Sequence, residues 1–149
     1  MDGLKEALVR YFIDEGRYDV EDFIHAYGDP RQALLMFRAF FPEFSEVDGH
    51  VVLSTFLNRA DEPQSLIARL RTSPSDVYSV LKGYRWIEVP YLFANTSLSE
   101  SDDHLLARML AHSWLAALSL SFPATRWVTR VLTPEETGSV VGVCFEEAV

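Results

Sequence analysis

The stretch SLSESDDHLLARMLAHSWLAALSLSFP, residues 97–123, decides the fold of this chain. It opens with the pattern of a capping box, Ser97-Leu98-Ser99-Glu100, and acidic side chains follow in the first turn, where the helix dipole favours negative charge. Apolar residues then recur every three or four positions, and Leu115 and Leu120 lie off the main stripe, which indicates burial on several sides. The sequence therefore predicts one long central helix over residues 98–121.

Two strands are predicted after this helix. Residues 126–132 and 139–146 read as the arms of an antiparallel hairpin. In the second arm Val141, Val143 and Phe145 alternate with other residues, so we expect these three side chains to point toward the core.

Further strands are predicted before the helix. The Asp48-Gly49 pair tolerates positive φ, so it predicts a tight hairpin turn between a strand over 44–47 and one over 50–57. Residues 84–89 alternate like a third strand. The whole chain is thus expected to be an α+β domain with a mostly antiparallel sheet of about four to five strands and the long helix packed on it.

The N-terminal third is predicted to be helical. Residues 4–15 place apolar side chains on one helical face (Leu4, Ala7, Leu8, Tyr11 and Phe12), and a second short helix is expected over 19–27. Asp29-Pro30 begins a third helix that Pro42 ends. Two more short helices are expected over 61–71 and 74–83. No linker or repeat divides the chain, which predicts a single domain over residues 1–149.

The charge balance excludes some classes of partner. The 149 residues include 13 Lys and Arg against 22 Asp and Glu, for a net charge of -9. Both halves are acidic, with a net -5 over residues 1–75 and -4 over 76–149. Binding of nucleic acid requires a basic surface, so direct nucleic-acid binding is disfavoured and a basic protein partner is favoured.

The compartment is expected to be the cytoplasm. Cys144 is the only cysteine, so no intramolecular disulfide can form. The acidic N-terminus is unlike a secretory signal. The most apolar run, residues 109–120, is too short to cross a membrane.

Motifs for catalysis or cofactor binding are absent from the sequence. His104 and His112 lie eight residues apart, about 12 Å along a helix, which is too far to share a metal ion. Cys144 lies in an apolar strand near acidic residues, which is typical of a packed thiol. We therefore expect no metal, no cofactor and no catalysis. The one alternative is a small enzyme built on Glu21, Asp22 and His25.

An acidic segment between residues 14 and 29 is the strongest candidate site. It holds more than half of the net charge of the chain, with six acidic residues against Arg17 alone. One interpretation is a solvated face that keeps the protein soluble, and the other is a docking surface for a basic partner. The candidate partner-binding residues are Asp14, Glu15, Asp19, Glu21, Asp22 and Asp29.

Two groups of aromatic residues form a second candidate. Core packing explains most of them, and an apolar groove or dimer face is the alternative. These residues are Phe37, Phe40, Phe41 and Phe44, and then Tyr84, Trp86, Tyr91 and Phe93.

These features lead to two main hypotheses. The first is a non-catalytic acidic protein-binding module, most concretely a bacterial immunity protein or antitoxin that neutralises a basic toxin or nuclease. The second is an adaptor or subunit of a homo- or hetero-oligomer, in which a homodimer would bury the aromatic surface and the charge would serve solubility only.

Overall fold

A computed structural model describes residues 28–93 and 99–148, so the helices expected over 4–15 and 19–27 lie outside the described residues. The helices are α3 (Pro30–Phe40), α4 (Glu62–Thr72), α5 (Val77–Lys82), α6 (Glu100–Ser121) and α7 (Pro134–Thr137). The strands are β1 (Phe44–Val47), β2 (His50–Leu53), β3 (Trp86–Glu88), β4 (Trp127–Leu132) and β5 (Gly142–Glu147). Two 3₁₀ turns are η1 (Ser54–Leu57) and η2 (Pro90–Phe93). The predicted α+β class is confirmed.

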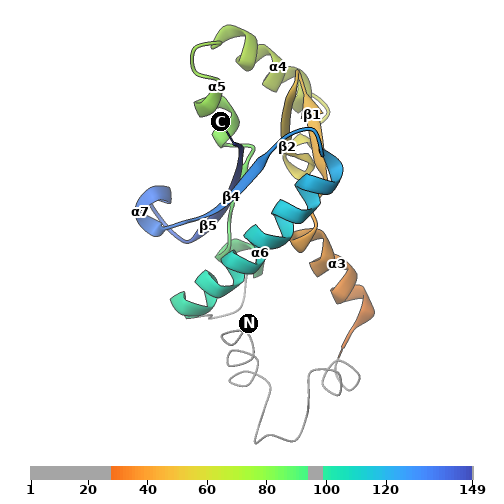
Figure 1. Cartoon of the computed structure of the whole chain (residues 1–149), viewed down its shortest axis with the longest axis vertical. Coiled ribbons are helices and arrows are strands. Elements are labelled where there is room, and N and C mark those ends of the chain that lie inside the picture. Colours follow the sequence, from red (N-terminus) through yellow and green to blue (C-terminus); the bar gives the residue numbers. More distant parts are fainter. Residues whose placement is uncertain (1–27, 94–98, 149) are drawn as a thin grey trace, which may run out of the picture.

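The strands form two antiparallel sheets. One holds β1 and β2, and the other has the order β3-β5-β4 (Figure 1). A backbone hydrogen bond of 3.0 Å from Leu53 to Tyr84 connects β2 to the residues just before β3. The side chain of Arg85 adds a second connection, a 2.8 Å hydrogen bond to the carbonyl of Val51 in β2, so the two sheets are neighbours.

The β1-β2 hairpin turns at the predicted pair. Asp48 has φ 51° and Gly49 has φ 82°, which is the left-handed conformation that such a two-residue turn requires. The second strand is shorter than expected, because the chain leaves the sheet after Leu53 and forms η1. The expectation of a continuous strand over residues 50–57 was wrong at its end.

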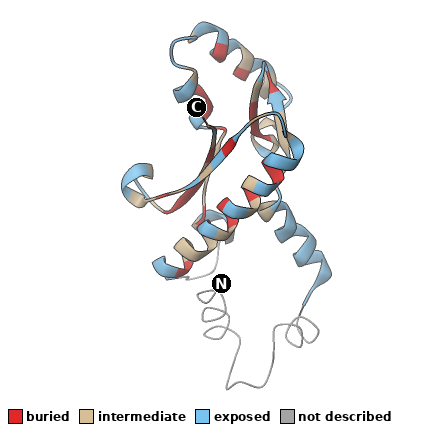
Figure 2. Ribbon diagram, in the orientation of Figure 1, coloured by how far each residue is buried: buried red, intermediate tan, exposed pale blue. Residues whose placement is uncertain are grey.

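The long helix is confirmed, with two corrections. Its N-cap is Ser99, whose side chain accepts a hydrogen bond from the backbone of Asp102, so the capping box predicted to start at Ser97 is wrong by two residues. Leu120 is 80% exposed, so α6 is not buried on several sides. The buried side chains follow a single face of α6 (Figure 2): Asp102, Ala107, Leu110, Ala111, Trp114, Ala117 and Leu118.

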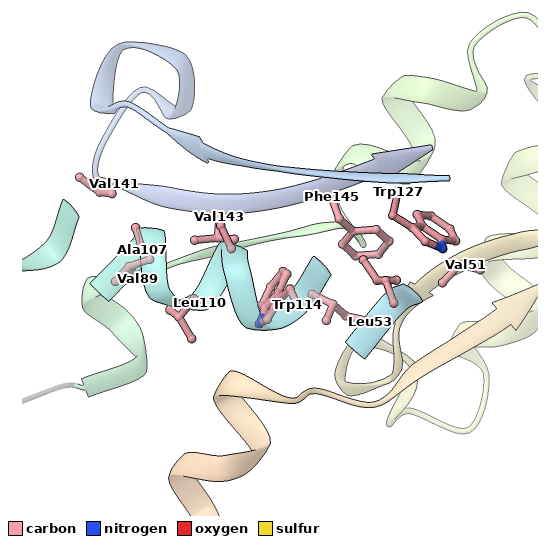
Figure 3. Close-up of a cluster of buried hydrophobic side chains, with 12 residues drawn as sticks. Val51, Leu53, Val89, Ala107, Leu110, Trp114, Trp127, Val141, Val143 and Phe145 are labelled. Atoms are coloured by element: carbon pink, nitrogen blue, oxygen red, sulfur yellow. The ribbon is translucent and has the colours of Figure 1, made fainter. Parts of the chain in front are cut away.

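The main core lies between α6 and the three-stranded sheet. Val143 and Phe145 point from β5 toward Leu110 and Trp114 of α6 (Figure 3). The rings of Trp114 and Phe145 meet edge to face, with centroids 6.3 Å apart. Val141, Val143 and Phe145 are all nearly inaccessible, which confirms the predicted alternation. Each fully buried side chain of this size stabilises the fold by roughly 1.5–3 kcal/mol.

A second, smaller core joins α4 and α5 to the β1-β2 sheet. Leu66 and Leu70 of α4 pack there with Val52 of β2 and with Tyr84. This cluster explains why the short helices expected near 61–71 and 74–83 form, because each buries one apolar side against the hairpin.

The β4-β5 connection contains a helical turn that the sequence analysis did not expect. In α7, Thr133 and Glu136 form a capping box, and Gly138 ends the turn with φ 82°. The first hairpin arm is close to the prediction, with β4 beginning at Trp127. The second arm, predicted to begin at residue 139, begins only at Gly142, because the Thr137 hydroxyl forms hydrogen bonds with the backbone of Val140 and keeps it out of the ladder. Within the described ranges, no helix has the length and apolar character needed to cross a membrane.

Candidate functional site

The structure places one of the six predicted partner-binding residues. Asp29 is the N-cap of α3, where its carboxylate accepts a 2.8 Å hydrogen bond from the backbone of Arg31. This contact gives Asp29 a structural role, because it satisfies one of the unpaired amides at the start of the helix. The other five lie outside the described residues: Asp14, Glu15, Asp19, Glu21 and Asp22. His25, the centre of the enzyme alternative, lies outside them as well.

The helix that follows Asp29 carries a large exposed apolar surface. α3 buries no residue among those described, and Figure 2 shows most of its length as exposed. Leu34 and Leu35 are 70% and 73% exposed, and the rings of Phe37 and Phe41 stack on each other at 4.9 Å. We call this the α3 surface, made of Leu34, Leu35, Met36, Phe37 and Phe41.

The α3 surface is held in place by the last turn of the helix. Ala39 and Phe40 pack against the main core. Trp114 of α6 donates a 2.9 Å hydrogen bond from its indole N–H to the carbonyl of Ala39, one of the carbonyls at a helix end that lack an intrahelical partner. The N-terminal part of α3 extends away from this anchor (Figure 1). The helix therefore presents its apolar side chains on a fixed base.

The expectation that core packing explains the aromatic residues holds only for some of them. Phe44 packs edge to face on Phe145 at 5.2 Å, and Tyr84 is buried. Phe37, Phe41 and Tyr91 are instead 57%, 40% and 69% exposed. The sequence signal for this difference was weak, because the apolar spacing of α3 is the same as that of a buried helix.

A hollow of about 380 Å³ continues the apolar surface beside α3. Its apolar lining comes from α3, β2, β3, η2 and α6, and comprises Leu35, Ala39, Leu53, Ile87, Leu92 and Trp114. At its margin Arg38 forms an exposed 3.1 Å ion pair with Glu43. The arrangement is an apolar depression with a charged margin, which is the usual construction of a protein-binding surface.

A second hollow, of about 280 Å³, lies on the face of the sheet away from α6. Trp86, Cys144 and Arg130 stand in one row across β3, β5 and β4. Burial raises the pKa of the Cys144 thiol, which disfavours the reactive thiolate. This agrees with the packed cysteine that the sequence predicts, and Arg130 is engaged with Glu136 and Glu146.

A third hollow is lined by a hydrogen-bonded group around Tyr84. The Tyr84 hydroxyl donates to Glu62, and Arg69 donates to the same hydroxyl at 3.1 Å. Burial and the neighbouring Glu62 carboxylate raise the pKa of Tyr84. The three groups satisfy one another and connect α4 to the chain before β3, which is a structural arrangement.

Metal-binding groups do not converge in the described part of the chain. No cluster of three or more His, Cys, Asp or Glu side chains occurs there that could hold a metal ion. His104 and His112, predicted to be too far apart for a shared ion, both lie on α6, with His112 exposed.

Comparison of the chain with protein-family models, with curated proteins and with solved structures finds no match.

Proposed function

We propose that this protein is a non-catalytic binding module that docks through the α3 surface onto a basic protein, as a bacterial immunity protein or antitoxin docks onto a toxin or nuclease. The observation that carries the proposal is the exposure of Leu34, Leu35 and Phe37 together on one anchored helix. Side chains of this size stabilise a fold only when they are buried. Their clustering on the surface is typical of a site that a partner covers.

Charge supports a basic partner. The chain carries a net -9, and the acidic segment 14–29 leads directly into α3 through Asp29. A partner with an apolar patch and a basic margin would therefore be attracted over a distance by charge and held by apolar contact. The two steps have different signatures, because ionic strength weakens the first and leaves the second almost unchanged.

The described pockets support a role without catalysis. Burial raises the pKa of the Cys144 thiol and so disfavours a thiolate, and Tyr84 and Arg130 are occupied by ion pairs or hydrogen bonds within the fold. A reducing compartment suits the single cysteine, so we place the protein in the cytoplasm as part of this proposal.

The test uses the full chain as bait in a lysate of its source cells. Retained proteins are identified, purified and titrated against the bait in a salt series. A basic protein should bind the wild-type chain and lose at least about tenfold in affinity to the Leu34→Ser/Phe37→Ser variant, because hot-spot side chains contribute 2 kcal/mol or more. The matched control is Tyr78→Ser, which removes an equally exposed aromatic ring from α5.

Two results would contradict the proposal. One is a partner that binds the Leu34→Ser/Phe37→Ser variant as tightly as the wild-type chain. The other is an affinity independent of salt, which would remove the electrostatic half of the argument. Replacing Asp19, Glu21 and Asp22 by the corresponding amides separates the electrostatic contribution from the apolar one. This variant should associate with the partner more slowly and dissociate at almost the same rate as the wild-type chain.

A further inference from the structure

The strand β4 forms one edge of the three-stranded sheet. Its six residues pair along their whole length with β5 on one side. On the other side no strand of the described residues pairs with it. This edge is distinct from the α3 surface, because β4 belongs to the three-stranded sheet and α3 is a separate helix (Figure 1).

The hydrogen bonds fix which backbone groups of β4 point outward. Ala148 donates to the carbonyl of Arg126, and Phe145 donates to the carbonyl of Arg85 on the opposite side of β5. In an antiparallel pair the bonded positions alternate. Val128, Arg130 and Leu132 therefore face β5, and the N–H and C=O groups of Trp127, Thr129 and Val131 face away from the sheet.

This edge lacks the usual features that prevent strand pairing. Natural edges are protected by proline, by bulges or by charged side chains. β4 contains no proline, and its pairing register with β5 is unbroken. Its one charged residue, Arg130, forms ion pairs within the chain. The guanidinium nitrogens lie 3.2 Å from a carboxylate oxygen of Glu136 and 3.3 Å from one of Glu146. Among residues 28–93 and 99–148, this edge is therefore open to a further strand.

We infer that β4 pairs with β4 of a second copy of this chain, antiparallel and centred on Thr129, to form a continuous six-stranded sheet. The outward backbone groups of Thr129 meet those of the same residue in the other copy. Trp127 lies opposite the partner's Val131, and Val128 lies opposite the partner's Arg130. Both kinds of pair are favourable across strands: an aromatic residue opposite a β-branched one, as for Trp127 and Val131, and Thr opposite Thr, as at position 129.

The sequence of β4 selects this register over its neighbours. Shifting the centre to position 130 places Arg130 opposite the partner's Arg130. Shifting it to position 128 places Arg130 opposite the partner's Arg126. Like charges directly opposite each other destabilise a strand pair, so of these three registers only the one centred on Thr129 avoids them. A twofold axis perpendicular to the sheet also keeps both copies of α6 on the same face, where each already packs.

The first test measures the mass of the full chain in solution against concentration. We expect the mass to rise from 17.0 kDa toward twice that value. Thr129→Pro removes an outward N–H at the centre of the interface and should weaken the dimer more than about tenfold. Thr129→Val keeps the N–H and the strand propensity, so it is the matched control and should leave the dimer intact.

A second pair of variants works even where Thr129→Pro fails to fold. Val128 is 38% exposed, and its neighbour within the chain is Glu146 on β5. Val128→Lys should gain an attraction to Glu146 and stabilise the fold, yet it faces the partner's Arg130 and should weaken the dimer roughly 3- to 10-fold. Val128→Glu should have the opposite effects: it should destabilise the fold by repulsion from Glu146 and strengthen the dimer by attraction to the partner's Arg130. A purely structural role would move dimer and fold stability in the same direction.

Salt separates this inference from the proposed function. Two copies with a net charge of -9 repel each other, so added salt should strengthen the dimer. Binding of a basic partner, as in the proposed function, should instead become weaker as salt is added. The inference is overturned if the chain stays monomeric at every concentration, if Val128→Lys and Val128→Glu leave association unchanged, or if Leu34→Ser dissociates the dimer while the β4 variants do not.

Discussion

The helices α3 and α6 are both rich in large apolar residues, yet they use them in opposite ways. α6 turns Leu110 and Trp114 onto the sheet, where each is at most 1% exposed. α3 leaves Leu34 and Phe37 more than half exposed and enters the core only through its last turn. Apolar side chains contribute to folding only in proportion to the area removed from water.

The comparison separates stability from binding. The residues of α6 stabilise the domain, and those of the α3 surface do so only if something covers them. Leu110→Ala, Trp114→Phe and Leu34→Ala test this distinction directly, and Tyr84→Phe tests a polar contact of the second, smaller core; the four are taken from the largest expected effect to the smallest.

Leu110→Ala should have the largest effect on stability. The side chain is fully buried between α6 and the sheet, and truncation leaves a cavity in a packed core. We expect the free energy of unfolding to fall by about 2–5 kcal/mol, measured by urea denaturation. A loss below about 1 kcal/mol would mean that α6 does not pack on the sheet as described.

Trp114→Phe should have an intermediate effect concentrated in α3. The variant keeps an aromatic ring in the core and removes the indole N–H that binds the carbonyl of Ala39. Loss of one hydrogen-bond partner at a half-buried carbonyl costs about 1–3 kcal/mol. Amide hydrogen exchange should therefore accelerate in α3 more than in β5. Equal acceleration in both elements would show that α3 has no separate anchor.

Local signals in the sequence predicted much of this fold. The Asp48-Gly49 turn, the start of α3 at Asp29-Pro30 and the alternation from Val141 to Phe145 each depend on residues close in sequence, so no tertiary information was needed. The acidic first turn of α6 was recognised in the same way, although the cap itself is Ser99. Short-range chemistry decides such features.

Features that depend on partners could not be predicted. The apolar spacing of residues 33–41 is compatible with a buried helix and with an exposed one, because a period of 3.6 residues says nothing about what covers the face. The division of five strands into two sheets depends on contacts between residues far apart in the sequence, such as the hydrogen bonds from Leu53 to Tyr84 and from Arg85 to Val51. For the same reason the α3 surface and the β4 edge became visible only in the structure.

Tyr84→Phe should have a smaller effect that depends on pH. Removal of the hydroxyl leaves Glu62 and Arg69 without their shared partner and should cost about 0.5–1.5 kcal/mol near neutral pH. Burial holds the pKa of Tyr84 above its usual value near 10.0 in the folded state. The stability that this shift contributes is complete below pH 10.0 and is lost as the pH rises toward the folded-state pKa.

The comparison with the variant isolates this contribution. Unfolding free energies measured from pH 8 to pH 11 should fall more steeply for the wild-type chain than for Tyr84→Phe, since other titrating groups are common to both. Parallel curves would mean that the hydroxyl is not desolvated in the folded protein.

Leu34→Ala should have the smallest effect on stability and gives the sharpest contrast with Leu110→Ala. It makes the same chemical change at a helix position that is 70% exposed, so we expect a change within about 0.5 kcal/mol. The competing possibility is that the predicted apolar stripe of residues 4–15 covers the α3 surface within the same chain. Leu34→Ala would then cost about 2 kcal/mol or more, and Leu8→Ala would cost a similar amount. Because the two outcomes differ several-fold, one denaturation series decides whether the α3 surface is available to a partner.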